Sequence, residues 1–68
     1  MQITVNGERR EVSGPLTVET LLHAFKLDPR IVVVEHNRRI LRGQELSQTT
    51  IQPDDQLEIV RIVGGGRG

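Results

Sequence analysis

The chain has 68 residues, no cysteine and nine basic against nine acidic side chains, so its formal net charge is zero. Its length predicts a single domain, and without cysteine it has no disulfide bond or thiolate metal ligand of its own. The balanced charge argues against a nucleic-acid partner, no apolar run approaches the ~20 residues that span a bilayer, and no signal-peptide pattern is visible. We therefore expect a small cytoplasmic protein with no membrane partner.

The first predicted element is a β-hairpin. Ile3 and Val5 alternate with polar residues, which indicates a strand with one buried face. Asn6-Gly7 is a strong signal for a two-residue type I′ turn. The return strand, from Glu8 to Val12, is charged, so we expect it at an edge of the sheet, where charge opposes further strand pairing.

One helix is clear from the sequence. Thr17 is placed to cap it, with Leu16 and Leu21 in the positions of a hydrophobic staple. The apolar positions that follow the spacing of one helix face are Val18, Leu21, Leu22 and Phe25. We expect the helix to continue to Asp28-Pro29, because the residue before a proline disfavours helical geometry.

The second half of the chain predicts strands separated by turns. Residues from Ile31 to Val34 are all β-branched, which is typical of a strand covered on much of both faces. A short strand is expected at Ile40-Leu41, then a loop with one helical turn within residues 42–52, and a turn at 53–55. Residues from Leu57 to Val63 predict the last strand, in which Val60 and Ile62 share one face.

This order of elements favours the α+β class. A hairpin precedes the single full helix and the last strand is long and apolar, so we place the two terminal strands side by side in the centre of a mixed sheet that the helix crosses on one face. That arrangement is the β-grasp, or ubiquitin-like, fold. It is expected over residues 1–63 as one domain, followed by a glycine-rich tail at 64–68.

We do not expect the chain to be an enzyme. His23 and His36 fall on a helix flank and in a turn, where we interpret both as solvated polar residues. The adjacent carboxylates Asp54 and Asp55 follow a proline and are interpreted as turn residues. No spacing typical of a catalytic triad or of a metal site with three or four ligands is visible.

Arginine provides eight of the nine basic residues. The arginines that cluster around the middle turn and the last strand are Arg38, Arg39, Arg42 and Arg61. We expect a solvated surface in which glutamates balance this charge, namely Glu35, Glu45 and Glu58. The alternative is a docking face whose guanidinium groups pair with carboxylates of a partner.

Four of the seven glycines lie in the last five residues, Gly64-Gly65-Gly66-Arg67-Gly68. A glycine backbone fits a channel that is too narrow for any Cβ atom. The stretch from Gly64 to Gly66 reaches roughly 10 Å, enough to present a terminal carboxylate inside the active site of another protein. The alternative is an end that frays without function.

The sequence resembles the ThiS family, the sulfur carriers of thiamine thiazole biosynthesis. The resemblance is carried by the run from Leu57 to Gly66, with support from the opening hairpin, Ile3 to Glu8, and from the segment between Val34 and Arg42. It covers the whole chain to Gly66. The small subunit of molybdopterin synthase shares the fold and the diglycine end, and it is the nearest alternative.

The resemblance implies a function at the C-terminus. A ubiquitin-activating-like adenylyltransferase of the ThiF type would use ATP to adenylate the carboxylate of Gly66, and a cysteine desulfurase pathway would supply the sulfur of a thiocarboxylate. A thiazole synthase of the ThiG type would receive that sulfur. The chain itself would bind no cofactor and would be a monomer when free. Val60, Ile62, Arg61 and Arg42 are the expected docking residues, and the alternative for Val60 and Ile62 is burial against neighbouring elements.

Two features depart from the family pattern. Asp54-Asp55 stands where the family usually has Gly-Asp before the last strand. In addition, Arg67-Gly68 follows the predicted terminal glycine. We favour proteolytic trimming, or residues foreign to the natural chain, over activation of Gly68, because an arginine side chain obstructs a channel of glycine width. A β-grasp interaction module without acyl chemistry is the competing interpretation.

Overall fold

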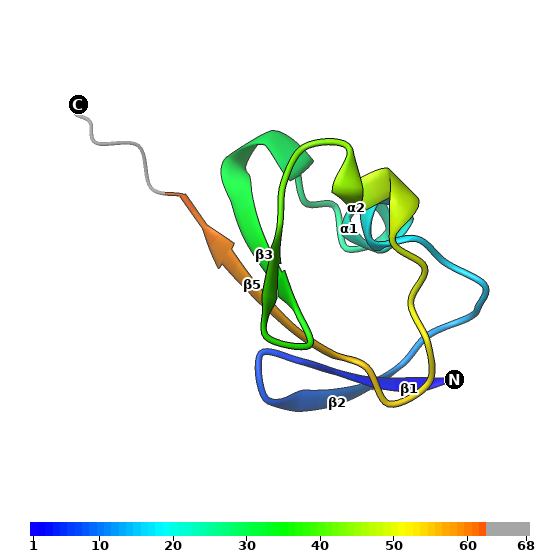
Figure 1. Ribbon diagram of the computed structural model, residues 1–68. Helices are drawn as coiled ribbons and strands as arrows, with labels where there is room; N and C mark the ends of the chain where they lie inside the picture. The colour runs from blue at the N-terminus through cyan, green and yellow to red at the C-terminus, as the bar shows by residue number, and fades with distance from the viewer. Residues whose placement is uncertain (63–68) are drawn as a thin grey trace.

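The computed structural model describes residues 1–62. A five-stranded sheet has the order β2-β1-β5-β3-β4, and the helices cover one of its faces (Figure 1). The elements are β1 (Gln2–Val5), β2 (Glu8–Glu11), α1 (Val18–Ala24), the 3-10 turn η1 (Pro29–Ile31), β3 (Val32–His36), β4 (Arg39–Leu41), α2 (Glu45–Gln48) and β5 (Gln56–Arg61). β1 and β5 run parallel, with β5 in the centre, which confirms the predicted β-grasp arrangement.

The N-terminal hairpin forms as predicted. Asn6 and Gly7 have φ angles of 51° and 81°, the left-handed values that a type I′ turn requires at both central positions. Among the described residues, β2 pairs with β1 alone and lies at the edge of the sheet. All four of its residues are exposed and charged, which keeps this edge from pairing with another strand.

The end of α1 differs from the prediction. The helix stops at Ala24 instead of continuing to Asp28-Pro29. Lys26 has a φ of 61°, and its N–H donates to the carbonyl of His23 at 2.9 Å. The N–H of the following residue donates to the carbonyl of Leu22 at 2.8 Å. These two bonds form a Schellman-type C-cap, which terminates the helix before the proline has any influence.

The core lies between the sheet and α1. Its side chains that are at most 2% exposed are Ile3, Val18, Leu21, Leu22, Val34, Ile51 and Leu57. The prediction that the β-branched run of β3 is covered on much of both faces is wrong. Val32 and Val34 are 8% and 1% exposed, but Val33 is 40% exposed, because within residues 1–62 no element covers the face of the sheet that points away from α1.

The connection from β4 to β5 contains one helical turn, α2, as expected for residues 42–52. Leu46 of α2 is buried in the core. Within residues 1–62, the helices are all too short, or too polar, to cross a lipid bilayer.

Candidate functional site

The predicted reactive end lies beyond the described residues. Gly64, Gly65 and Gly66, together with the alternative Gly68, fall outside the part of the chain that the structure describes. Their roles therefore stay predictions. The described part ends at Ile62, whose N–H donates to the carbonyl of Ile31 at 2.7 Å. The described part of the candidate site is therefore β5, the strand that precedes the glycines.

Asn6 extends the support of β5 past the end of β1. Its backbone N–H donates to the carbonyl of Leu57 at 2.9 Å. Its side-chain Oδ1 then accepts from the N–H of Ile59 at 2.7 Å, and Nδ2 donates to the carbonyl of Ile59 at 3.1 Å. The side-chain amide of Asn6 thus makes the two hydrogen bonds to β5 that the backbone of a further β1 residue would otherwise make. The sequence predicts Asn6 only as a turn residue, and no local pattern indicates this contact with Ile59.

The outer face of the sheet, which points away from α1, carries an exposed apolar patch. Its members are Val33 (40% exposed), Ile40 (46%), Val60 (60%) and Ile62 (53%). Val33 and Val60 lie directly opposite each other in the β3–β5 ladder. The alternative that neighbouring elements bury Val60 and Ile62 is therefore wrong, and their role in docking stays a prediction.

The other two predicted docking residues do not lie within this patch. Arg61 lies between Val60 and Ile62 in sequence, so its side chain is on the face of α1, where it lines a hollow of about 260 Å³ with Arg10 and Phe25. The guanidinium of Arg10 lies 4.8 Å from the centre of the Phe25 ring. The predicted docking residues therefore belong to two faces of the sheet.

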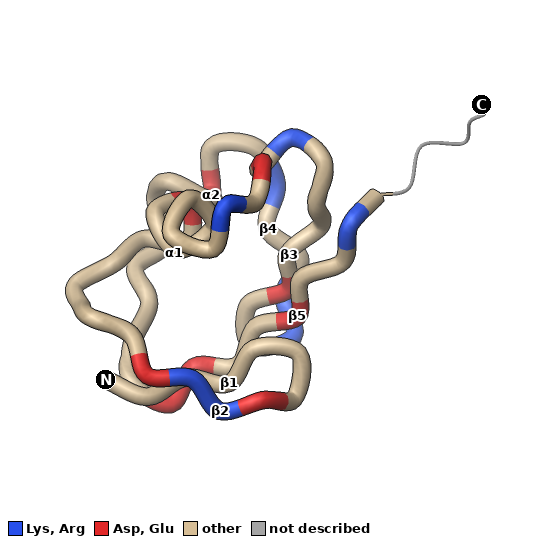
Figure 2. Tube along the Cα trace, turned by 180° about the vertical axis from the view of Figure 1, so that it is seen from behind, with Lys and Arg blue, Asp and Glu red and all other residues tan. Residues whose placement is uncertain are grey.

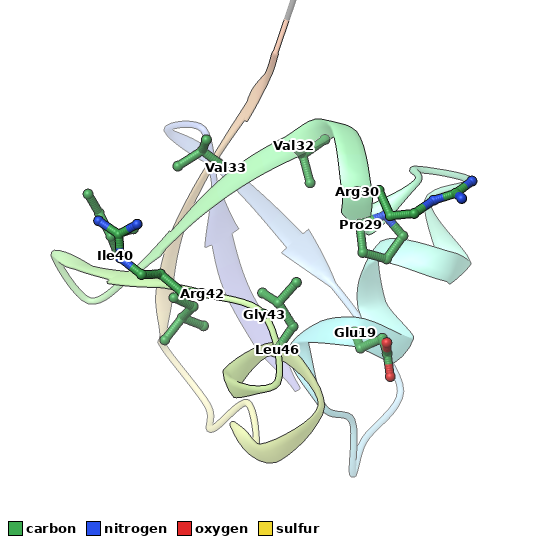
Figure 3. Close-up of a pocket in the computed structure, with 10 residues that line it drawn as sticks. Glu19, Pro29, Arg30, Val32, Val33, Ile40, Arg42, Gly43 and Leu46 are labelled. Carbon is green, nitrogen blue, oxygen red and sulfur yellow. The ribbon is translucent and has the colours of Figure 1, made fainter.

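Arg42 lies at the rim of a shallow groove. The groove has a volume of about 610 Å³ and lies between β3, β4 and the helical segments. Figure 3 shows the side chain of Arg42 extending along Ile40, with Leu46 deeper in the groove. Val33 and Ile40 line the groove as well, so it opens at the border of the apolar patch.

The arginine surface is only partly balanced in the way we predicted. Glu45 accepts from the side chain of Arg39 at 3.1 Å and from the backbone N–H of Arg42 at 2.7 Å, which confirms its place in that surface. Glu35 and Glu58 are in no ion pair with any residue between 1 and 62. They therefore do not balance the arginines through ion pairs as predicted, and strand register places them opposite each other.

The prediction of a solvated His36 is also wrong. Its Nε2 donates to the carboxylate of Asp55 at 2.6 Å, and the two side chains are only 17% and 10% exposed. Asp55 also accepts from the N–H of Gln52 at 2.8 Å and from Nδ2 of Asn37 at 3.1 Å. This cluster of side chains joins the end of β3 to the turn before β5. His23 is exposed, as predicted.

The pKa of Asp55 reflects this environment. Burial by itself raises the pKa of the carboxyl, but the hydrogen bonds from the Gln52 N–H, His36 and Asn37 outweigh it. The net pKa lies below the ordinary value of 3.8, so the carboxylate is ionised at neutral pH and acts only as an acceptor. In the described part of the chain, histidines and carboxylates nowhere gather in the groups of three or more that hold a metal ion.

The comparisons with known proteins agree with this architecture. A model of the ThiS family matches residues 3–66. The chain belongs to the ThiS family. A crystal structure of the ThiS thiamine biosynthesis protein from Geobacter metallireducens superposes with a TM-score of 0.83 at 36% identity, over 97% of this chain and 100% of that one.

Two curated relatives extend the comparison. The sulfur carrier protein ThiS of Bacillus subtilis is 36% identical over 50 residues, which are 74% of this chain and 76% of that protein. A thiazole synthase of Paramagnetospirillum magneticum is 41% identical over 66 residues, which are 97% of this chain. The chain spans only about a fifth of the thiazole synthases that it matches, 20% of this one and 21% of another.

Proposed function

We propose that this member of the ThiS family is a sulfur carrier of thiamine thiazole biosynthesis, with the carboxylate of Gly66 as its reactive group. The observation that carries the proposal is the match to the family over residues 3–66, which ends at the predicted glycine. The folded domain presents its C-terminal glycine to other enzymes as a substrate, and the chain performs no catalysis itself.

The arrangement of β5 supports this function. The strand is hydrogen-bonded to β3 on one side and to β1 and Asn6 on the other. Figure 1 shows it running past the end of β1 and away from the helices. The strand is thus held on both sides as far as Ile59 and on the β3 side beyond it, which anchors the strand that precedes the glycines.

The chemistry that we propose uses the carrier as a co-substrate. A carboxylate is a poor electrophile, so an oxygen of Gly66 first attacks the α-phosphorus of ATP, and pyrophosphate leaves. The terminal sulfur of a persulfide, formed by a cysteine desulfurase, then attacks the acyl carbon of the adenylate, and AMP leaves. A thiol attacks the remaining S–S bond of this acyl disulfide and forms a disulfide with the former persulfide sulfur, so that the thiocarboxylate is released. The resulting thiocarboxylate donates its sulfur to a thiazole synthase. The ATP and its metal ion belong to the ThiF-type activating enzyme.

The names of the relatives support the thiamine pathway over the molybdopterin alternative. One relative is called a sulfur carrier protein ThiS, and two are called thiazole synthase. A region that resembles this chain is thus part of the same polypeptide as a thiazole synthase. We infer from this that the final sulfur acceptor of the present carrier is formed by a thiazole synthase.

Intact-mass measurement tests the proposal directly. We expect a variant of the chain that ends at Gly66 to gain an AMP adduct when it is incubated with ATP and its activating enzyme. Addition of the sulfur source should then replace one oxygen of the free acid by sulfur. A variant that ends at Gly65 is the matched control, and we expect it to react far more slowly because its carboxylate falls one residue short.

The full chain distinguishes the possible roles of Arg67-Gly68. An adduct on a chain that retains these residues would place activation at Gly68, whereas an adduct only after their removal requires trimming. If neither form reacts, the carrier function is refuted, and the interaction module without acyl chemistry takes its place.

A further inference from the structure

Two glutamates lie face to face on the outer face of the sheet. Glu35 of β3 is directly opposite Glu58 of β5 in the antiparallel ladder. Figure 2 shows the two acidic positions side by side where these strands pair. Directly opposed side chains in such a ladder have Cβ atoms about 5 Å apart, and like charges at that distance repel each other. Within the described chain, neither carboxylate has a basic partner.

The two glutamates lie next to the side chains of the apolar patch. The next row of the ladder toward the end of β5 is Val33 opposite Val60. On its other side, Glu35 is opposite Ile40 of β4. Apolar side chains of three strands therefore border the acidic pair, and these side chains are 40–60% exposed. Any protein that covers the patch must also cover Glu35 and Glu58.

Covering these carboxylates requires a cation from the partner. A buried charge without a partner is strongly unfavourable, and two neighbouring like charges are worse. The guanidinium group of an arginine has five N–H donors in a planar fork, enough to bind both carboxylates at once. A partner surface that is purely apolar or acidic is thereby rejected, so the pair provides specificity as well as attraction.

We propose that this face is the docking surface for thiazole synthase, and that the synthase places an arginine or lysine side chain over the Glu35–Glu58 pair. The inference rests on the sulfur-carrier function proposed above. The choice of occupant follows from the relatives in which a region 41% identical to this chain belongs to a thiazole synthase polypeptide. Domains joined in one chain meet at high effective concentration, so the carrier-like region and the synthase of those relatives contact each other readily.

A second copy of the chain fits the same surface poorly. Strand register places Arg9, opposite Thr4, on this face. Its guanidinium already donates to Gln2 at 2.8 Å and to Asp54 at 3.4 Å. A symmetric dimer through the patch would therefore have to break the contacts of Arg9, or turn Arg42 inward from the border of the patch, to bring a cation to the glutamates.

The test is a binding titration with purified thiazole synthase from the same organism. We expect Glu58→Gln to raise the dissociation constant by about tenfold or more, because the cation of the partner loses one of its carboxylates. We expect Glu35→Gln to act in the same direction. Added salt should weaken the binding of the wild-type chain more than that of either variant. Glu8→Gln, which removes an exposed carboxylate from the other face of the sheet, is the matched control and should leave the dissociation constant unchanged.

Urea unfolding of the free variants separates docking from folding. Glu58→Gln should keep or raise the unfolding midpoint, because it removes a repulsion from the isolated domain. Equal affinities of the wild-type chain and Glu58→Gln for the synthase would overturn the proposal. It would also be overturned if the wild-type chain used this face to bind the activating enzyme, or a second copy of itself, and did not use it to bind the synthase. If the AMP adduct still forms in those cases, only the docking inference fails. If no adduct forms, the proposed function itself fails.

Discussion

Replacement of Asp55 by asparagine tests the cluster that joins β3 to the turn before β5. In the wild-type chain, one carboxylate oxygen accepts from the Gln52 N–H at 2.8 Å and from His36 at 2.6 Å. The other accepts from Nδ2 of Asn37 at 3.1 Å. An asparagine side chain has one oxygen and one NH₂ group, so at least one of the three donors around it must face the NH₂ group, which is itself a donor. Asn37 cannot turn its amide around without losing the bond between its Oδ1 and the N–H of Gln56.

The expected loss follows from these contacts. Two hydrogen bonds lose their charge assistance, and a third is removed while its donor is partly exposed to water. A hydrogen bond to a charged group contributes about 1 kcal/mol more than a neutral one, so we expect Asp55→Asn to lower the free energy of unfolding by about 2 kcal/mol. In a domain of this size, that loss corresponds to a decrease of about 10 °C in Tm.

Urea unfolding at neutral pH measures this loss, with Asp54→Asn as the matched control. The side chain of Asp54 is 78% exposed and its one ion pair, to Arg9, is 3.4 Å long. Asparagine also tolerates the left-handed φ of 69° at this position. We expect the control to change the free energy of unfolding by less than about 0.5 kcal/mol. Equal effects of the two substitutions would refute the reasoning, because only one of them breaks the buried cluster.

The pH dependence provides a second check. The pKa of Asp55 is lowered in the folded chain relative to 3.8, so its carboxylate stabilises the fold fully above pH 3.8. This stabilisation is lost as the pH falls through the lower pKa of the folded state. The difference in stability between wild type and Asp55→Asn should therefore shrink as the pH is lowered below 3.8.

Three further predictions address the core, the support of β5 and a surface ion pair. Leu57→Ala, at a position that is 1% exposed, should lower the free energy of unfolding by about 3 kcal/mol in urea. Asn6→Ala removes both side-chain bonds to Ile59 and should cost about 1–2 kcal/mol, with faster hydrogen exchange of the Ile59 amide. The carboxyl of Asp28 should titrate by NMR at about 2, because the side chain and the backbone N–H of Arg30 hydrogen-bond to it.

Each of these predictions has an internal control. Val60→Ala, at an exposed position of the same strand, should change stability by less than about 0.5 kcal/mol, and a loss equal to that of Leu57→Ala would contradict the assigned core. Asn6→Asp keeps the acceptor for the Ile59 N–H but turns a second oxygen toward the Ile59 carbonyl, so it should also destabilise the chain, and an unchanged stability of both variants would argue against the two-bond bridge. In Arg30→Ala, the pKa of Asp28 should rise toward 3.8, and an unchanged value would exclude the ion pair as its cause.

The sequence predicted most of the elements because their signals are local. The hairpin depends on two residues that accept left-handed φ angles, and the start of α1 depends on Thr17, whose side chain accepts from the N–H of Thr20 at 3.1 Å. The end of α1 was predicted too late, because the proline was read as the stop signal. Lys26 ends the helix first, and a left-handed lysine leaves no pattern that the sequence alone reveals.

The candidate site was predicted less completely, because its geometry depends on register. Sequence alternation placed Val60 and Ile62 on one face, but it did not show that the same face of β3 is open or that Val33 lies opposite Val60. Likewise, nothing in the sequence pairs Glu35 with Glu58, or brings His36 against Asp55 across 19 residues.

The order of the predicted elements was thus enough to predict the α+β fold, and the run from Leu57 to Gly66, with the opening hairpin and the segment between Val34 and Arg42, was enough to predict the family. They describe single positions or neighbours along the chain, where backbone preference and side-chain period act directly. Only the tertiary structure determined which charged side chains lie next to each other. Pairing of distant strands in one register brings together side chains that no local preference relates, and it turned two unremarkable glutamates into an acidic pair on an open apolar face.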